Sequence, residues 1–172
     1  MAERGDVEAF ERVILPHLDD AYTLARYLLR DEHDAQDVVQ DAALRALRYF
    51  SGYSGGDARS WLLAIVRNVS LTWRRRHRDL ATSVDITELP VADHRETDTR
   101  AVDASERARI IRALEQLPDE YREVIVLREV QELSYKEIST IVGVPIGTVM
   151  SRLARGRKRL AALLSHGLEE AG

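Results

Sequence analysis

The chain has 172 residues, of which 31% are charged and 45% hydrophobic, and its formal net charge is −4. Length and composition suit a soluble globular protein of one domain or two small ones, and the absence of cysteine excludes disulfides, thiolate metal sites and cysteine nucleophiles. No apolar run approaches the roughly 20 residues that span a bilayer, and the acidic N-terminus is unlike a secretory signal, so we expect a cytoplasmic protein without membrane insertion.

The charges are distributed unevenly along the chain. Residues 1–78 carry 12 Arg against 12 Asp and Glu, residues 79–105 carry 2 against 7, and residues 106–172 carry 11 Lys and Arg against 10. The acidity therefore lies in the middle, and the basic residues cluster locally. Such a protein should bind DNA weakly by itself, because its overall attraction to phosphates is small.

Helical periodicity dominates the N-terminal part, with almost no alternating strand pattern. The pattern predicts a first helix over about 7–29, a second over about 34–49 and a third over about 58–76. Between the second and third, residues 50–57 include three glycines and two serines, which indicates a flexible loop.

The second predicted helix has an unusual polar face. Asp37, Gln40, Asp41, Leu44 and Arg48 share one side, and Val39, Ala43, Ala46, Leu47 and Phe50 share the other. An acidic face that includes a leucine suits docking to a basic or mixed helical partner, although the pattern by itself favours an ordinary solvated face.

The third predicted helix ends in a basic run, Arg74–Arg76, and carries Trp61 and Trp73. Aromatic rings that stack on bases, beside cations that follow phosphates, are typical of single-stranded nucleic-acid binding. The alternative is that Trp61 belongs to the core and that the arginines form a solvated last turn favoured by the helix dipole.

Residues 79–105 have no helical periodicity and contain Pro90, so we expect a linker. Residues 106–165 then predict four helices, of which the second opens at Pro118 and runs to about Val130.

The last two of these helices predict a helix-turn-helix over 133–160. Ser134 and Glu137 have capping-box spacing, and Leu133 and Ile138 flank them as a hydrophobic staple. Gly143 supplies the left-handed residue that ends the first helix, and Pro145 can open the second. This arrangement leaves the second helix free to enter a DNA major groove.

The second helix of this motif has a basic face. Between Gly147 and Leu160 there are five Lys and Arg and no Asp or Glu. The residues that fall away from its apolar stripe are Ser151, Arg152, Arg155, Lys158 and Arg159. A merely solvated basic face is the alternative, which the capped first helix and the glycine turn make less favourable.

Four segments in this order and spacing, 34–46, 58–68, 117–128 and 133–159, resemble a bacterial extracytoplasmic-function (ECF, group IV) RNA polymerase sigma factor. The resemblance implies an all-α fold of two small helical domains. Residues 1–78 match sigma region 2, residues 79–105 form a flexible acidic linker, and residues 106–172 match sigma region 4.

The resemblance also implies a role for each matching residue. Core RNA polymerase would be bound by Asp37, Val38, Gln40, Asp41 and Leu44. The minus-ten element, including the melted non-template strand, would be read by Tyr53, Trp61, Asn68, Trp73, Arg74, Arg75 and Arg76, with Asn68 holding a flipped-out base. The minus-thirty-five element would be contacted by Arg128, Thr148, Met150, Ser151, Arg152, Ala154, Arg155, Lys158 and Arg159.

We therefore expect a promoter-specificity subunit, not an enzyme, which binds core polymerase and promoter DNA and has an anti-sigma factor as a further partner. One alternative is a sigma mimic that titrates an anti-sigma factor; another is a free-standing helix-turn-helix repressor. The five histidines are scattered without metal-ligand spacing, so we expect neither a metal, a cofactor nor a catalytic site.

Overall fold

The computed structural model describes residues 4–81 and 99–170, and these residues form two helical bundles. The N-terminal bundle contains α1 (Arg4–Ile14), α2 (Leu18–Leu29), α3 (Glu32–Tyr49) and α4 (Ala58–Ala81). The C-terminal bundle contains α5 (Thr99–Gln116), α6 (Asp119–Ile125), α7 (Tyr135–Val142) and α8 (Ile146–Glu170). Within the described ranges no strand is present, which confirms the all-α prediction.

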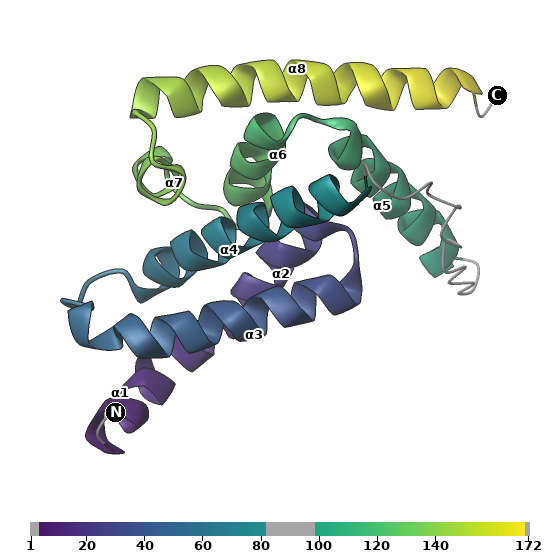
Figure 1. The fold of residues 1–172 in the computed structure, drawn as a ribbon. Helices are drawn as coiled ribbons and strands as arrows, with labels where there is room; N and C mark the ends of the chain where they lie inside the picture. Colours follow the sequence, from purple (N-terminus) through teal and green to yellow (C-terminus); the bar gives the residue numbers. More distant parts are fainter. Residues whose placement is uncertain (1–3, 82–98, 171–172) are drawn as a thin grey trace.

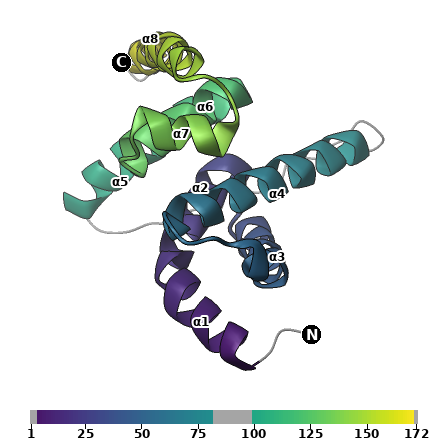
Figure 2. The same cartoon turned by 90° about the vertical axis from the view of Figure 1, so that its left-hand side faces the viewer.

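The two bundles pack against each other through α4. Helices α2, α3 and α4 pack together, α8 packs on α5, α6 and α7, and α4 also contacts α7 across the boundary. Figure 1 shows α8 along one edge of the molecule and α3 along the opposite edge, with α4 between them. Figure 2 shows α4 lying beneath α6 and α7. Leu62, Leu63 and Val66 on α4 are completely buried.

The prediction of one helix over 7–29 is wrong, because two helices, α1 and α2, occupy this part of the chain. A 3-10 turn, Leu15–His17, separates α1 from α2. Pro16 lies at the start of that turn, where its missing N–H and its ring prevent a continuous α-helix. The second helix begins two residues before the prediction, at Glu32, because the Asp31 side chain caps it by accepting a hydrogen bond from the Asp34 amide at 3.0 Å.

The predicted linker over 79–105 is wrong at both of its ends. Helix α4 continues to Ala81, and α5 begins at Thr99. The start of α5 is rich in Ala and Arg, which favour helix even without an apolar stripe. Residues 82–98 lie outside the described residues, so a flexible acidic linker there stays a prediction.

The four predicted helices of the C-terminal part are present. The one that opens after Pro118 reaches Val130 as predicted, but Val126–Val130 at its end is π-helical. A π-helical turn is uncommon and marks a local irregularity. Gln131 follows this turn and is buried at the boundary between the bundles.

Gly156 sets how closely α8 approaches α6. A Cβ at this position would meet the Ile125 Cδ1 at 2.8 Å and the Tyr121 Cβ at 3.2 Å. Both neighbours belong to α6, so the missing side chain lets the two helices pack at short range. No part of this contact follows from the local sequence.

We expect Gly156→Leu to destabilise the C-terminal bundle by about 2 kcal/mol or more, because the added side chain overpacks the α6–α8 contact. Thermal unfolding monitored by circular dichroism measures the effect. Gly167→Leu is the matched control on the same helix, since a Cβ there would have no atom within 4 Å. Equal melting temperatures for the two variants would contradict this packing role.

Candidate nucleic-acid interface

The predicted helix-turn-helix is present with its predicted caps. The Ser134 amide donates to Glu137 Oε2 at 2.8 Å, and the Glu137 amide donates to Ser134 Oγ at 3.1 Å. Gly143 ends α7 with φ of 76°, in the left-handed region. The Ser139 hydroxyl donates to the Val144 carbonyl at 2.5 Å and so ties the turn to α7. Local interactions therefore set the angle at which α8 leaves the turn.

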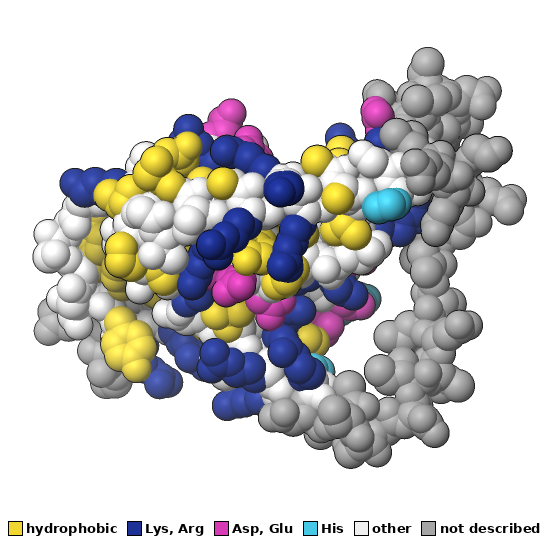
Figure 3. Space-filling model, turned by 90° about the horizontal axis from the view of Figure 1, so that it is seen from above, with side chains coloured by type: hydrophobic (Ala, Val, Ile, Leu, Met, Phe, Trp, Pro, Cys, Tyr) yellow, Lys and Arg dark blue, Asp and Glu magenta, His cyan; other side chains and the backbone are white. Residues whose placement is uncertain are grey.

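One face of α8 is exposed and carries most of the residues that we predict to contact the minus-thirty-five element. Met150 is 53% exposed, whereas Val149 and Leu153 are buried in the core. The other exposed members are Ser151, Ala154, Arg155, Lys158 and Arg159, and Thr148 and Arg152 are half-buried. Figure 3 looks down on this side of the molecule and shows Lys and Arg side chains gathered there. This arrangement presents a basic helix face to solvent.

Two of the predicted minus-thirty-five residues also support their own bundle. The Arg128 guanidinium donates to the Leu133 carbonyl at 2.8 Å and lies 4.7 Å from the centre of the Tyr135 ring. The Arg159 guanidinium lies 4.9 Å from the centre of the Tyr121 ring. Both cations therefore gain from an aromatic ring in the free protein.

Most of the predicted polymerase-binding residues lie on one exposed face of α3. Asp37 and Gln40 are exposed, and Leu44 is 61% exposed, which is high for a leucine. Asp41 is half-buried and forms an ion pair with Arg45 one turn along the helix, at 3.2 Å. An exposed leucine among carboxylates is a surface suited to a protein partner.

Val38 is a correction to that predicted set. Its side chain is 1% exposed and belongs to the core with Ala35, Ala42 and Ala46. The predicted buried stripe, which began at Val39, is rotated by about one residue. Val39, Leu47 and Phe50 are only partly buried at its edge. Val38 therefore holds α3 in place and offers no surface to a partner.

Tyr53 and Trp61 belong to a cluster of aromatic rings beside the glycine loop. Phe50 stacks on Tyr53 with 5.6 Å between ring centres, and the Tyr53 and Trp61 rings are 5.2 Å apart. The Tyr53 hydroxyl donates to the Gly56 carbonyl at 2.7 Å. All three rings are partly exposed, so the cluster both organises the loop and presents aromatic surface.

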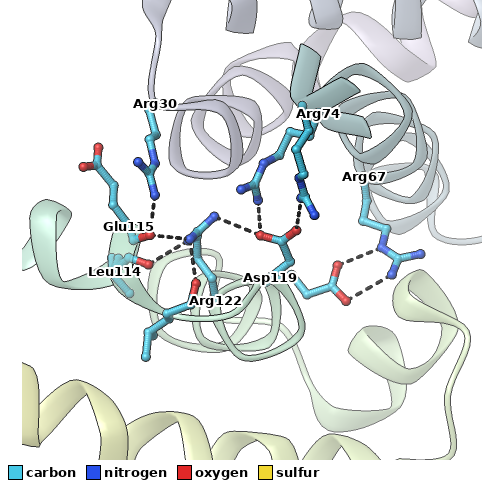
Figure 4. A network of polar contacts seen from close by, with 10 residues as sticks. Arg30, Arg67, Arg74, Leu114, Glu115, Asp119 and Arg122 are labelled. Atoms are coloured by element: carbon cyan, nitrogen blue, oxygen red, sulfur yellow. Dashed lines mark hydrogen bonds and ion pairs between the residues drawn. The ribbon is translucent and has the colours of Figure 1, made fainter. Parts of the chain in front are cut away.

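The remaining predicted minus-ten residues lie on α4 in unequal environments. Asn68, Arg75 and Arg76 are exposed. Trp73 stacks on His77, with their ring centres 3.3 Å apart. Arg74 is different, because its guanidinium is partly buried and forms an ion pair with Asp119 of α6 (Figure 4).

Sequence reasoning missed two residues that position this interface. The first is Asp57, the N-cap of α4, whose carboxylate accepts hydrogen bonds from the hydroxyl and the amide of Ser60. The hydrogen bond from the Ser60 hydroxyl is the main reason that the pKa of Asp57 is lowered. The spacing of Asp57 and Ser60 just before an apolar run was a signal that could have found this cap.

The second missed residue is Arg122, whose side chain is one of the largest that are fully buried. It donates to the carbonyls of Leu114, Glu115 and Leu117 at 2.7, 2.6 and 2.6 Å, and so caps the C-terminal end of α5. Burial lowers its pKa to about 10, which leaves it charged at neutral pH. An arginine within a helical pattern gives no local signal of such a role.

Comparison with known proteins identifies both halves of the chain. Residues 13–79 match the family model for sigma-70 region 2, and residues 107–160 match that for sigma-70 region 4. ECF RNA polymerase sigma factor SigE of Mycolicibacterium smegmatis is 33% identical over 173 residues, which cover 98% of this chain and 67% of that protein. The chain belongs to the ECF RNA polymerase sigma factors. As such it is a promoter-specificity subunit and not an enzyme.

Further relatives extend the family assignment over the full length. The RNA polymerase sigma-H factor of Pseudomonas aeruginosa is 32% identical, with 98% of this chain and 93% of that protein covered. The sigma factor RpoE of Bartonella quintana, solved in complex with the anti-sigma factor NepR, has a TM-score of 0.72 and 28% identity. That match covers 92% of this chain and 98% of the solved one. The sigma factor fold is therefore shared across both bundles.

Two further properties of the described residues bear on other kinds of site. None of their helices is both long and apolar enough to cross a membrane. Likewise, residues 4–81 and 99–170 contain no group of three or more His, Asp or Glu side chains that could hold a metal ion.

We expect Asp57→Ala to lower stability by about 1 kcal/mol at pH 7, because the first turn of α4 loses its cap. The lowered pKa means that this contribution is present above the ordinary value of 3.8 and is lost as the pH falls through the folded-state value. Urea unfolding of both proteins between pH 7 and about pH 2 should show their free energies of unfolding converge only once the pH falls below 3.8. Asp57→Asn keeps a good cap without the pH dependence, and an undiminished difference at low pH would contradict this assignment.

We expect Arg122→Leu to lower stability by about 3 kcal/mol, because three carbonyls at the end of α5 lose their buried donor. Arg112→Leu changes an exposed arginine of α5, the helix whose end Arg122 caps, and should stay within about 0.5 kcal/mol of the wild type. Urea unfolding of the full chain compares them. A loss no larger for Arg122 than for Arg112 would refute the capping role.

Proposed function

We propose that this sigma factor divides promoter recognition between its two bundles. The N-terminal bundle, residues 1–78 with the extension of α4 to Ala81, binds core RNA polymerase through α3 and the minus-ten element through α4 and the preceding loop. The C-terminal bundle, within 106–172 and the helix that begins at Thr99, binds the minus-thirty-five element through α8. The observation that carries this proposal is the exposed basic face of α8, the second helix of a helix-turn-helix whose first helix is capped.

The chemistry of α8 indicates how it reads DNA. Arg155 and Lys158 are exposed cations that suit phosphates or guanine edges. Met150 and Ala154 are apolar and exposed, so at these positions they would contact thymine methyl groups and contribute no hydrogen bonds. Part of the specificity then comes from DNA shape.

Core polymerase supplies the affinity that the free protein lacks. With a net charge of −4, the chain has little general attraction for DNA. Binding through α3 would place both bundles on one promoter, and the second contact would then form at a high effective concentration. Exposed Asp37 and Leu44 fit such a docking surface. This work takes place in the cytoplasm, where polymerase and DNA are present.

An anti-sigma factor is a further proposed partner. The Bartonella quintana relative was solved with the anti-sigma factor NepR, and its similarity covers both bundles of this chain. A solved structure of CnrH in complex with the cytosolic domain of CnrY is likewise similar, with a TM-score of 0.69 and 26% identity over 92% of this chain.

Run-off transcription from a fragmented bacterial genome tests the proposal, with core polymerase in the presence and absence of this protein. We expect discrete transcripts that require it, and their upstream regions should share two elements. Stable core binding without transcripts would indicate the sigma mimic. DNA binding without any core binding would indicate the free-standing repressor.

Three variants separate the steps in the same assay. Asp37→Lys should weaken core binding, Asn68→Ala should keep core binding but slow strand opening, and Arg155→Ala should lower promoter affinity about tenfold, for a lost contact of about 1–2 kcal/mol. The control is Arg112→Ala, an exposed arginine of α5 outside the proposed surfaces.

A further inference from the structure

The arginine contacts between the two bundles all run in one direction. Arginines of the N-terminal bundle donate, and carboxylates or carbonyls of the C-terminal bundle accept, at three separate places. The donors are Arg30, Arg59, Arg67, Arg74 and Arg78, and the acceptors are Glu115, Asp119, Glu123 and Gln131. The bundles are therefore joined by opposite charge as well as by apolar packing.

The largest of these places lies where α6 crosses α4. Arg67 forms a double hydrogen bond with Glu123, at 2.8 and 3.0 Å, and the two side chains are only 19% and 3% exposed. Asp119 forms ion pairs with both Arg74 and Arg78, the latter at 3.1 Å. Figure 4 shows Arg67 and Arg74 reaching from α4 toward the carboxylates of α6.

A second place joins α4 to the end of the π-helical turn. Arg59 donates to the carbonyl of Gln131 at 2.8 Å and to its side-chain oxygen at 3.0 Å, and it pairs with Asp20 at 2.7 Å. The Gln131 side chain donates in turn to the Asp20 carbonyl at 3.1 Å. This group connects α2, α4 and the C-terminal bundle in one hydrogen-bonded set.

These contacts engage the helix that we propose to read the minus-ten element. A carboxylate and a phosphate are alternative partners for the same guanidinium, because both accept two parallel hydrogen bonds from an edge of its planar group. While Asp119 holds Arg74, that arginine is unavailable to a phosphate. In contrast, the basic face of α8 stays exposed in the same arrangement.

The physical chemistry of the seam favours reversible opening. Burying an ion pair costs desolvation that offsets much of its attraction, so each pair holds the bundles only modestly. A polar pocket of about 320 Å³ lies at the seam, lined by Arg67, Arg75, Arg78 and Arg152 together with Asp119, Glu120 and Glu123. Solvent ions that reach this pocket screen the charges and weaken the contact.

We propose that α6 is an internal competitor of nucleic acid. In the free protein Asp119 and Glu123 occupy arginines of α4 and hold the bundles closed, and α4 binds the melted strand only after the bundles separate. This inference rests on the proposed role of α4 in reading the minus-ten element. Closure therefore restrains strand capture while it leaves the minus-thirty-five helix accessible.

The first part of the test measures closure in the full chain. Because the chain has no cysteine, Glu11→Cys and Ser165→Cys provide two unique exposed positions for a pair of dyes. We expect energy transfer to fall when salt is raised from about 0.05 M to about 0.5 M. The variant Arg59→Ala with Glu123→Gln, which we call the unlatched variant, should show the low value already at low salt.

The second part measures binding of a fluorescein-labelled, random-sequence DNA single strand of about 12 nucleotides. The unlatched variant should bind it about tenfold more tightly, the gain expected if one tenth of the wild type is open. The matched control is Arg157→Ala with Glu129→Gln, which removes an exposed ion pair within the C-terminal bundle and the same charges. It should match the wild type in both measurements.

A charge exchange keeps the test independent of folding. Glu123→Arg alone should open the bundles by repulsion from Arg67, and adding Arg67→Glu should restore the wild-type energy transfer. Unchanged energy transfer in the unlatched variant overturns the proposal, and so does opening without tighter strand binding. Neither result changes the outcome that we expect in run-off transcription. A failure of this inference is therefore distinguishable from a failure of the proposed function.

Discussion

The buried guanidinium of Arg122 is the contact on which the arrangement of the two bundles depends. The free energy lost when this group leaves water is offset by the hydrogen bonds that it donates to three carbonyls at the end of α5 and to the carboxylate of Asp119. By touching Asp119 it also helps to orient the first turn of α6, and the same carboxylate then faces Arg74 across the boundary. One side chain therefore ends a helix, begins the next and presents an acceptor to the other bundle.

The two surfaces that we propose to read DNA are consequently unequal in the free chain. The face of α8 around Arg155 is exposed, whereas α4 shares Arg67 and Arg74 with α6. Polymerase, by binding α3, would have to offer the two bundles separate positions before both surfaces can reach one promoter. The weak overall charge of the chain fits this division, because neither surface needs to hold DNA by itself.

The features that sequence reasoning predicted well are those with short-range causes. The capping box of Ser134 and Glu137, the left-handed Gly143 and the helix that follows Pro145 all depend on neighbours within a few residues. The helix break at Pro16 was also within reach of such reasoning, since proline interrupts a helix locally. Its apolar surroundings instead suggested one long helix. The rotation that buries Val38 was not within reach, because α3 has small apolar residues on more than one side.

The sequence by itself determined the all-α class, the order of the four motifs and the helix-turn-helix, because periodicity and caps act through local geometry. Only the tertiary structure decided which of several similar arginines is free, paired or buried. Arg74 and Arg76 look alike in the sequence, yet one pairs with a carboxylate 45 residues away and the other is exposed. Partners so distant along the chain meet only when whole helices pack, and the residues around an arginine carry no signal of which partner that packing will supply.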